Sequence, residues 1–278
     1  MIRRLTFAAV LAIGSAGAAA PLQVHNGRLF IDARINGVAT EALLDSGAEA
    51  TVIDPVLAAK AHLPEGTAQR MRGSGGSAAA HLVEGVTVSA LGLDLHPEAV
   101  IVTDLTDVSS RLIGRPTHAI VGRELFDTAR LRVDIPNAEA SIVSRDRVPL
   151  GKRLPLTGHA GIEAIPVLAN GRNVSAEFDL GNGSDVLISR ALANRLKLKV
   201  VGRKQGGGIG GPLLRDLVTI AWLDVAGRRF RNVTAAVDDQ SNANDLNIGT
   251  AILRHFLITT DFKERSVWLQ ALPEGKNG

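Results

Sequence analysis

The chain has 278 residues, enough for one large domain or two of ordinary size. Apolar residues make up 45% of it, which excludes a disordered chain, and its 29 glycines argue against an all-helical bundle. A formal net charge of +3, 3% aromatic residues and no cysteine argue against nucleic-acid binding and exclude disulfides, thiol catalysis and thiolate metal sites.

The first 20 residues form a unit typical of a secretory leader. Two arginines and an apolar run over 5–13 precede small residues at 16–20, where cleavage after Ala18 is favoured. We therefore expect 1–20 to be a signal peptide and the protein to be exported, to the periplasm or the medium. An uncleaved anchor is the alternative, although the run is short for a membrane span. No later stretch is long enough to cross a membrane, so we expect no stable insertion once the leader is removed.

In chain order, the first half predicts strands, tight turns and short helices. Residues 28–36 alternate between apolar and polar side chains and end in the hairpin signal Asn36-Gly37. Asp54 can cap a helix over 55–61, which begins with proline. The other elements expected here are a strand over 83–93 and a short helix after Gly122.

The second half predicts the same order of elements. A strand over 163–169 ends in the turn Asn170-Gly171, and Ser189 can cap a helix over 190–196. The other elements expected here are a strand over 217–225 and a short helix after Gly249. Because strands dominate both halves, we expect a mainly β protein made of two small barrel-like lobes.

A sequence repeat relates the two halves. ALLDSGAEATVID at 42–54 aligns with AEFDLGNGSDVLI at 176–188 and places Asp45 opposite Asp179. The later segments AIVG and VDI align with LNIG and TDF in the same order, at 119–122, 133–135, 246–249 and 260–262. Internal repeats of this kind indicate duplicated units. The expected organisation is an N-terminal lobe over 21–148, a polar linker over 149–153 and a C-terminal lobe over 154–278.

Each half places an aspartate at the end of an apolar strand, two residues before a glycine. Burial beside that strand desolvates the carboxylate, and a glycine turn can supply backbone N–H donors to it. A pseudo-two-fold axis between the lobes would bring Asp45 and Asp179 face to face, where they would share one proton. One carboxylate could then activate a water while the other protonates a carbonyl. This is general acid–base hydrolysis of a peptide bond without a metal or a covalent intermediate.

These motifs resemble those of the retropepsin-like (clan AA) aspartic proteases, here as a single chain with two tandem lobes. Asp45-Ser46-Gly47-Ala48 matches the family signature Asp-Thr/Ser-Gly-Ala/Ser/Thr. Ile120-Val121-Gly122 and Asn247-Ile248-Gly249 resemble the pair of residues and glycine that the family packs beneath its catalytic loops. The resemblance implies the acid-protease fold of two pseudo-symmetric β-barrel lobes with a few short helices. It also implies catalysis by Asp45 and Asp179, supported by Ser46, Gly47, Ala48, Gly181 and Asn182.

Two glycine-rich segments resemble the hairpin flaps that cover the substrate in that family. Glycine would give a flap its flexibility and let it approach the substrate backbone closely. The residues concerned are Gly73, Ser74, Gly75 and Gly76 in the first half and Gly208, Ile209, Gly210 and Gly211 in the second.

The second lobe departs from the family pattern at Leu180, where a hydroxyl residue would bond across the interface. Ser46 can offer that bond and Leu180 cannot. The leading hypothesis is an exported aspartic endopeptidase that acts on a peptide or protein substrate as a monomer, with no cofactor. One alternative is a catalytically impaired pseudo-protease that binds peptides. Another is a homodimer in which only the first lobe is active.

Other chemical motifs are poorly supported. Gly206-x-Gly208-x-x-Gly211 matches a dinucleotide fingerprint, but charged residues precede it and Pro212 follows, where a strand and a helix are required. The chain has no Gly-x-Ser-x-Gly elbow, and its seven histidines show no metal-ligand spacing. We therefore expect neither a dinucleotide nor a metal.

Overall fold

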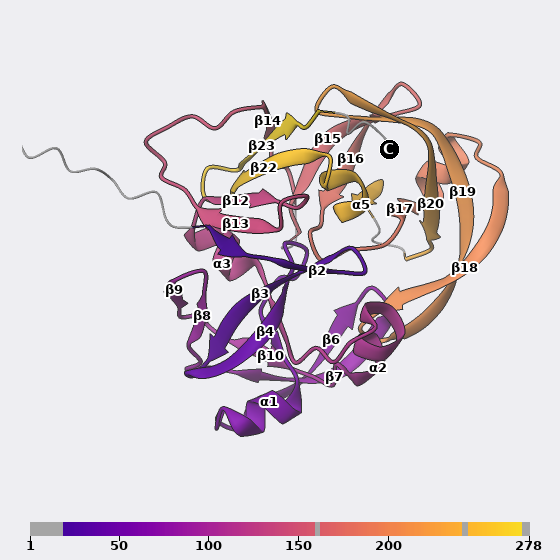
Figure 1. Ribbon diagram of the computed structural model, residues 1–278. Helices are drawn as coiled ribbons and strands as arrows, with labels where there is room; N and C mark the ends of the chain where they lie inside the picture. Colours follow the sequence, from indigo (N-terminus) through magenta and orange to yellow (C-terminus); the bar gives the residue numbers. More distant parts are fainter. Residues whose placement is uncertain (1–18, 159–161, 241–243, 274–278) are drawn as a thin grey trace, which may run out of the picture.

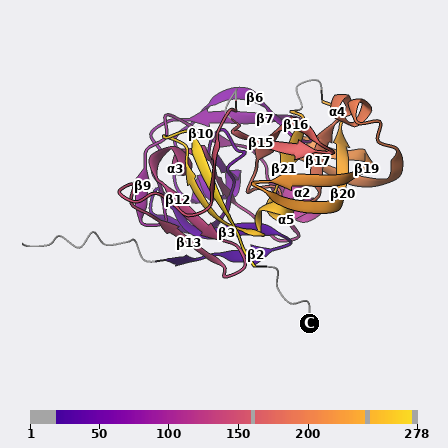
Figure 2. The same cartoon turned by 90° about the horizontal axis from the view of Figure 1, so that it is seen from above.

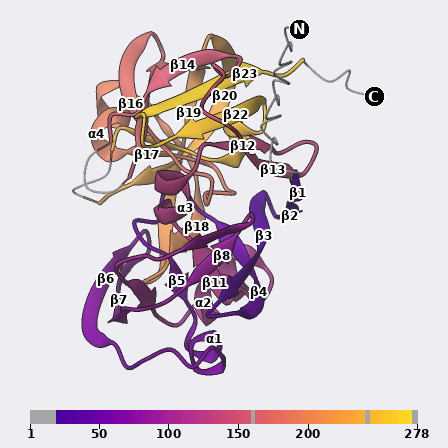
Figure 3. The same cartoon turned by 90° about the vertical axis from the view of Figure 1, so that its left-hand side faces the viewer.

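The computed structural model describes residues 19–158, 162–240 and 244–273. The expected leader thus lies outside the described residues except for its last two. Strands dominate and form three sheets, which confirms the expected mainly β class. Figures 1 and 3 show one body built from the first half of the chain and another built mostly from the second, with a shared sheet beside them. No helix of the described ranges is long and apolar enough to cross a membrane.

Lobe one is defined here by a ten-stranded sheet from the first half, in the order β6-β7-β10-β5-β11-β4-β3-β8-β9 with β2 added to β3. Its strands are β2 (Gln23–His25), β3 (Arg28–Ile35), β4 (Val38–Leu44), β5 (Val52–Ile53), β6 (Thr67–Gly73), β7 (Gly76–Val83), β8 (Val88–Ala90), β9 (Leu93–Leu95), β10 (Val100–Val102) and β11 (Ala119–Val121). Its helices are α1 (Pro55–Lys60), α2 (Thr106–Val108), the π-helical turn η1 (Ser109–Ile113) and α3 (Arg123–Thr128).

Lobe two is defined by a seven-stranded sheet in the order β15-β16-β21-β17-β20-β19-β18. Its strands are β15 (Ala164–Ala169), β16 (Arg172–Phe178), β17 (Val186–Ser189), β18 (Val200–Gly208), β19 (Gly211–Val225), β20 (Arg228–Asp238) and β21 (Leu246–Ile248). Its helices are α4 (Arg190–Arg195) and α5 (Thr250–Leu253). A further pairing of β15 with β19 closes six of these strands into a barrel.

The third sheet joins the two halves of the chain; its strands are labelled in Figure 3, and part of it is seen from above in Figure 2. Its order is β1-β13-β12-β22-β23-β14, with β1 (Ala20–Pro21), β12 (Leu131–Asp134), β13 (Glu139–Ile142), β14 (Lys152–Pro155), β22 (Phe256–Asp261) and β23 (Ser266–Ala271). Strands β12 and β22 carry corresponding parts of the sequence repeat, and they pair antiparallel with Val133 opposite Ile258. The two copies of the repeat therefore meet about a pseudo-two-fold axis.

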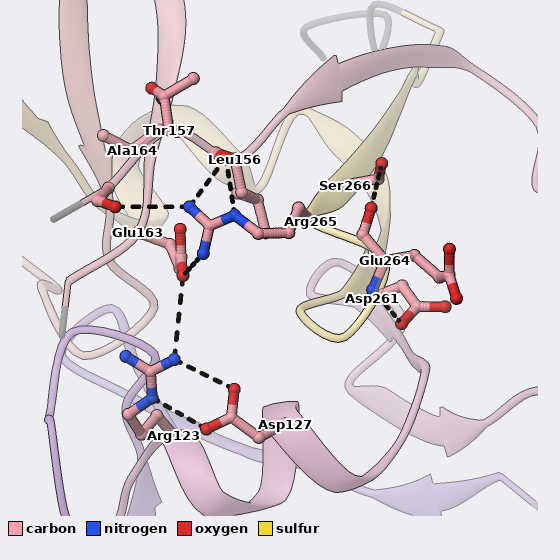
Figure 4. A network of polar contacts seen from close by, with 11 residues as sticks. Arg123, Asp127, Leu156, Thr157, Glu163, Ala164, Asp261, Glu264, Arg265 and Ser266 are labelled. Carbon is pink, nitrogen blue, oxygen red and sulfur yellow. Dashed lines mark hydrogen bonds and ion pairs between the residues drawn. The ribbon is translucent and has the colours of Figure 1, made fainter.

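Ion pairs to two buried carboxylates reinforce the junction between the halves. Asp261 is fully buried and accepts hydrogen bonds from Arg130 Nε and Arg145 Nε, each at 2.9 Å. In a second network, Glu163 Oε1 lies 2.6 Å from Arg265 Nη1 and 3.8 Å from Arg123 Nη2 of α3 (Figure 4). Such charge-assisted contacts fix the orientation of the elements that they join.

Most local expectations are confirmed. Asp54 caps α1 by accepting from the N–H of Val56, and Ser189 caps α4 by accepting from the N–H of Leu192. The hairpin turns at 36–37 and 170–171 have positive φ at both positions, as Asn-Gly turns of this type require. Short helices follow Gly122 and Gly249, as expected.

The prediction of one strand over 83–93 is wrong. The chain leaves β7 at Val83, turns at Gly85 with φ +73°, and then forms the separate hairpin β8–β9. The hairpin turns at Leu91 and Gly92, where φ is +50° and +80°. The apolar pattern continues through this segment because β8 and β9 each bury side chains, so hydrophobicity alone does not show where the strand breaks.

Candidate active site

Each predicted catalytic aspartate follows a strand that pairs in parallel with a second strand of its lobe. Asp45 follows β4, and its N–H donates to Val121 O of β11 at 3.0 Å. Asp179 follows β16, and its N–H donates to Ile248 O of β21 at 3.1 Å. The two loops are therefore held in the same way at the end of the same strand pair, as the repeat predicts.

Backbone N–H groups of the two turns bind both carboxylates. The N–H of Gly47 donates to Asp45 Oδ1 at 2.8 Å. The N–H groups of Gly181 and Asn182 both donate to Asp179 Oδ1 at 2.9 Å. Hydrogen bonds to a carboxylate favour its charged form, so these turns offset part of the cost of removing the carboxylates from water.

The glycine of each loop faces the aspartate of the other lobe. A Cβ atom on Gly181 would lie 2.2 Å from Asp45 Cγ, and one on Gly47 would lie 2.9 Å from Asp179 Cγ. Any side chain at these positions would separate the loops. The absence of a Cβ therefore lets the two carboxyl groups come together, where they hydrogen-bond to each other.

The proximity of the two groups alters the protonation of Asp45. Burial, followed by the negative charge of Asp179 and the hydrogen bond to it, raises the pKa of Asp45 to about 8, while the N–H groups of Gly47 and Ala48 oppose the rise. Two carboxylates this close cannot both ionise without a large repulsion. The Asp45–Asp179 pair, called the dyad below, is therefore set to hold one proton near neutral pH.

Ser46 makes the cross-lobe bond that was expected of it. Its buried Oγ donates to Phe178 O at 2.8 Å and accepts from the N–H of Leu180 at 2.9 Å. Leu180 has a fully buried side chain with no polar atom to return the contact. The hydroxyl contact made by Ser46 therefore has no counterpart from Leu180 of lobe two.

The residues beneath the loops also occupy the expected places. Arg123 N donates to Ala48 O at 3.0 Å after Gly122, and Thr250 N donates to Asn182 O at 2.9 Å after Gly249. A Cβ on Gly249 would lie 1.9 Å from Asn182 O, so this position requires glycine. Each glycine lets the following helix approach the catalytic loop of its own lobe.

Sequence reasoning gave Glu177 no role, and it placed Asn247 beneath the catalytic loop but not against the aspartate. Asn247 Nδ2 donates to Asp179 Oδ2 at 2.8 Å and to Glu177 Oε2 at 2.9 Å, while Asn247 Oδ1 accepts from Asn182 Nδ2 at 2.8 Å. In the aligned repeat they correspond to Leu43 and Ile120. A comparison of the two halves at these positions could have found them.

A third missed residue is Arg28, at the start of β3. Its guanidinium is buried and donates to Asn26 O and Ser184 Oγ, each at 3.3 Å. Burial lowers the pKa of Arg28, while the charges of Asp179 and Asp45 oppose that fall. This cation therefore lies close enough to favour negative charge on the dyad. An arginine in an amphipathic strand gives no sequence signal for such a position.

The two predicted flaps are hairpins whose tips meet. Strands β6 and β7 form one and β18 and β19 the other, and the long β18–β19 hairpin extends from lobe two towards α2 of lobe one (Figure 1). The N–H of Gly75 donates to Ile209 O at 3.0 Å. A Cβ on Gly73 would lie 2.4 Å from the same oxygen, and one on Gly75 would lie 2.2 Å from Gly211 O. The glycines therefore permit contact between the two flap backbones.

Contacts from lobe one hold the second flap in place. Arg111 of η1 donates through Nη1 to Gly206 O at 2.9 Å and through Nη2 to Gly208 O at 3.1 Å. The side chain of Ile209 packs on a small apolar cluster of lobe one. In return, Arg215 of the second flap donates to Ser74 O of the first at 3.0 Å. The predicted flap residues are thus brought together in one closed cover.

Comparison with known proteins agrees with this geometry. A family model described as aspartyl protease matches residues 31–124 and 165–252, one region in each half of the chain. A search of curated proteins finds no match. The two matched regions contain both aspartate loops and both glycine-rich hairpins. The chain therefore belongs to the aspartyl protease family, in its retropepsin-like form, as two tandem copies in one polypeptide.

Proposed function

We propose that the protein is an exported aspartic endopeptidase in which Asp45 and Asp179 act together. The observation that carries this proposal is the meeting of the two carboxyl groups across the lobes, each bound by the turn of its own loop and faced by the glycine of the other. Membership of the aspartyl protease family supports the same reaction class.

In the proposed reaction, the protonation of the dyad assigns the roles. Because the pKa of Asp45 is raised to about 8, we assign the shared proton and the role of acid to Asp45, which leaves Asp179 to act as the base. Asp179 removes a proton from a water as its oxygen attacks the carbonyl carbon, and Asp45 gives its proton to the carbonyl oxygen. When the tetrahedral intermediate collapses, the C–N bond breaks and the amide nitrogen takes the proton held by Asp179. One of the two hydroxyl protons of the intermediate returns to Asp45, which restores the dyad and leaves a carboxylic acid and an amine as products.

The substrate would bind in an extended conformation between the lobes, beneath the flaps. Extended peptides bind to strand edges by main-chain hydrogen bonds, and the paired flap hairpins offer such groups. The closed flaps must open to admit the peptide and would exclude bulk water after closing again. Glycines at the flap tips permit both movements.

Export and a monomeric state are part of the proposal. The leader pattern over 1–20 supports export, and cleavage after Ala18 would leave β1, which pairs with β13, in the mature protein. A single chain supplies both aspartates, so activity would not require a dimer.

A peptide-binding protein with little or no activity is the second candidate. The observation that favours it is Leu180, which cannot return the hydroxyl contact that Ser46 makes across the lobes. In this interpretation the two lobes and the flaps still hold an extended peptide, but the dyad is not held firmly enough for turnover.

Cleavage assays with dyad variants test the proposal. The purified protein is incubated with an unfolded protein and a peptide library from acid to neutral pH, with and without a transition-state-mimicking aspartic protease inhibitor. Asp45→Asn and Asp179→Asn are assayed beside the wild type. We expect inhibitable cleavage that each substitution lowers by about a thousandfold, since each removes acid–base catalysis. Cleavage that survives in either variant would contradict the shared dyad, and folded protein without cleavage would favour the peptide-binding candidate.

A further inference from the structure

The lobe-one side of the dyad is lined by apolar side chains. Leu43 of β4 lies two residues before Asp45 in the sequence, and it pairs with Ile120 of β11. Both are buried in a small cluster that is separate from the main core of the protein. Ile209 of the opposite flap packs on this cluster, which places the cluster beneath the closed cover. The other buried members of the cluster are Phe30, Val52, Leu105 and Ile113.

The same two positions in lobe two are polar. Glu177 of β16 lies two residues before Asp179 in the sequence. It pairs with Asn247 of β21, just as Leu43 pairs with Ile120 in lobe one. Alternate side chains of a strand point to the same face, so Glu177 shares the face of the catalytic aspartate. The hydrogen bonds from Asn247 Nδ2 to both carboxylates confirm that they are neighbours.

Glu177 is a half-buried carboxylate whose hydrogen-bond partners are neutral. Its Oε1 accepts from Asn244 Nδ2 at 2.6 Å, and its Oε2 accepts from Asn247. Burial and the charges of Asp179 and Asp238 raise the pKa of Glu177, against the lowering effect of the two amides. The environment therefore disfavours its charge, although the group remains partly open to solvent.

The nearby cations are engaged elsewhere. Arg215 Nη1 pairs with Asp238 at 3.1 Å, and Arg28 donates to Asn26 and Ser184. Within the described ranges, no lysine, arginine or histidine pairs with Glu177. A partly desolvated carboxylate without a cation is costly, and a cation brought by a ligand would relieve that cost.

We propose that the substrate site at the dyad is asymmetric, with an apolar substrate side chain received beside Leu43 and a lysine or arginine side chain received by Glu177 on the other side of the scissile bond. The inference rests on the proposed endopeptidase function and names its substrate class. In an extended peptide, successive side chains point to opposite faces, so the two residues that flank the scissile bond enter opposite lobes. The long stem of lysine or arginine can lie along this site while its charged end reaches the carboxylate. Glu177 is thus a specificity-determining residue.

Matched peptides test the inference. Each pair differs at one residue beside the scissile bond, either lysine against norleucine or arginine against citrulline, and both flanking positions are varied. At one of the two positions we expect wild-type kcat/KM to favour the cation by about tenfold or more. Glu177→Gln, which keeps the size and one of the two acceptor oxygens, should lose this preference, so that kcat/KM for the cationic peptide falls by about tenfold or more relative to its neutral match. Glu177→Leu, which copies Leu43, should favour norleucine on both sides.

Other outcomes would overturn the inference. An equal loss for charged and neutral peptides in Glu177→Gln would show that Glu177 acts only by positioning Asp179 through Asn247. A wild-type enzyme that favours norleucine at both positions would contradict a cation site. Glu98→Gln serves as the control, since it removes the same charge from an exposed site in lobe one.

A binding experiment separates failure of this inference from failure of the proposed function. The Asp45→Asn variant is titrated with the same uncleaved peptides by calorimetry. Tighter binding of the lysine peptide, lost when Glu177→Gln is added, would support the cation site even if the wild type cleaves nothing. Equal binding of the lysine and norleucine peptides would overturn it whether or not the enzyme is active.

Discussion

The two catalytic loops have the same backbone frame but different side chains. In both loops the aspartate follows a strand that is paired in parallel, and the glycine faces the carboxyl group of the other lobe. The Ser46 hydroxyl of lobe one bonds to the lobe-two backbone on both sides of Asp179, and Leu180 at the matching position cannot return this contact. Lobe two instead surrounds its aspartate with Asn182, Asn247 and Glu177. The comparison teaches that two fused lobes can keep the geometry of the dyad while the residues around each aspartate differ. In lobe one they join the loops, and in lobe two they surround the carboxylate with polar groups.

The largest effect is expected from adding a methyl group to the glycine that faces the opposite aspartate. Gly181→Ala would put a Cβ 2.2 Å from Asp45 Cγ, whereas Gly47→Ala would put one 2.9 Å from Asp179 Cγ. Both should force the loops apart, and a small misplacement of reacting groups costs about a hundredfold in rate. We expect the Gly181 variant to be the less active of the two. Measurement of kcat/KM for both, with thermal unfolding to verify folding, checks this order, and equal activity to wild type would contradict the facing geometry.

Removal of the Ser46 hydroxyl, which bonds to lobe two, should lower both activity and stability. Ser46→Ala leaves the buried Phe178 O and Leu180 N–H without this partner, which costs about 2 kcal/mol or more of the free energy of unfolding. Ser46→Thr keeps the hydroxyl and is the matched control. Chemical denaturation and kcat/KM of the two variants give the comparison. A Ser46→Ala protein as stable and active as the threonine variant would show that the bond has no role in joining the loops.

The raised pKa of Asp45 predicts a pH dependence of activity and of stability. Activity should fall as pH rises through about 8, because the dyad then loses the proton that it needs. Between the usual pKa of 3.8 and about 8, the folded protein binds a proton that the unfolded chain has released. Its stability should therefore decrease as pH rises over this window, and Asp45→Asn should lack that part of the decrease. Thermal unfolding of both proteins across the window measures the difference, and parallel curves would contradict it.

Substitutions at the flap tips, which also differ between the lobes, should have a smaller effect on activity. Ile209 packs on the apolar cluster of lobe one, whereas Ser74, its counterpart, contacts the other flap through its carbonyl oxygen. Ile209→Ser should weaken closure and raise KM by about fivefold, since flap closure holds the substrate. Ser74→Ala should leave KM within about twofold, since it keeps that carbonyl contact. Steady-state kinetics on one peptide separates the two variants, and equal effects would show that the flaps are equivalent.

The sequence predicts the backbone elements of the site better than the polar side chains around the dyad. The repeat identifies the matched loops, caps and flaps because each depends on a short local signal, such as Asp-x-Gly or a glycine cluster. The shared six-stranded sheet was missed because pairing between strands that are far apart in the sequence gives no local pattern. Arg28 and Glu177 were missed for the same reason, since their meaning depends on which carboxylates lie nearby in space.

The most direct test of one dyad formed from both lobes is a mixing experiment with the two inactive variants. Asp45→Asn and Asp179→Asn are assayed separately, as a mixture, and beside wild type over an approximately hundredfold dilution series. We predict that both variants stay inactive when mixed and that the specific activity of the wild type does not change on dilution. Activity in Asp179→Asn alone that falls on dilution would contradict the account, because it would place the active dyad between the first lobes of two chains.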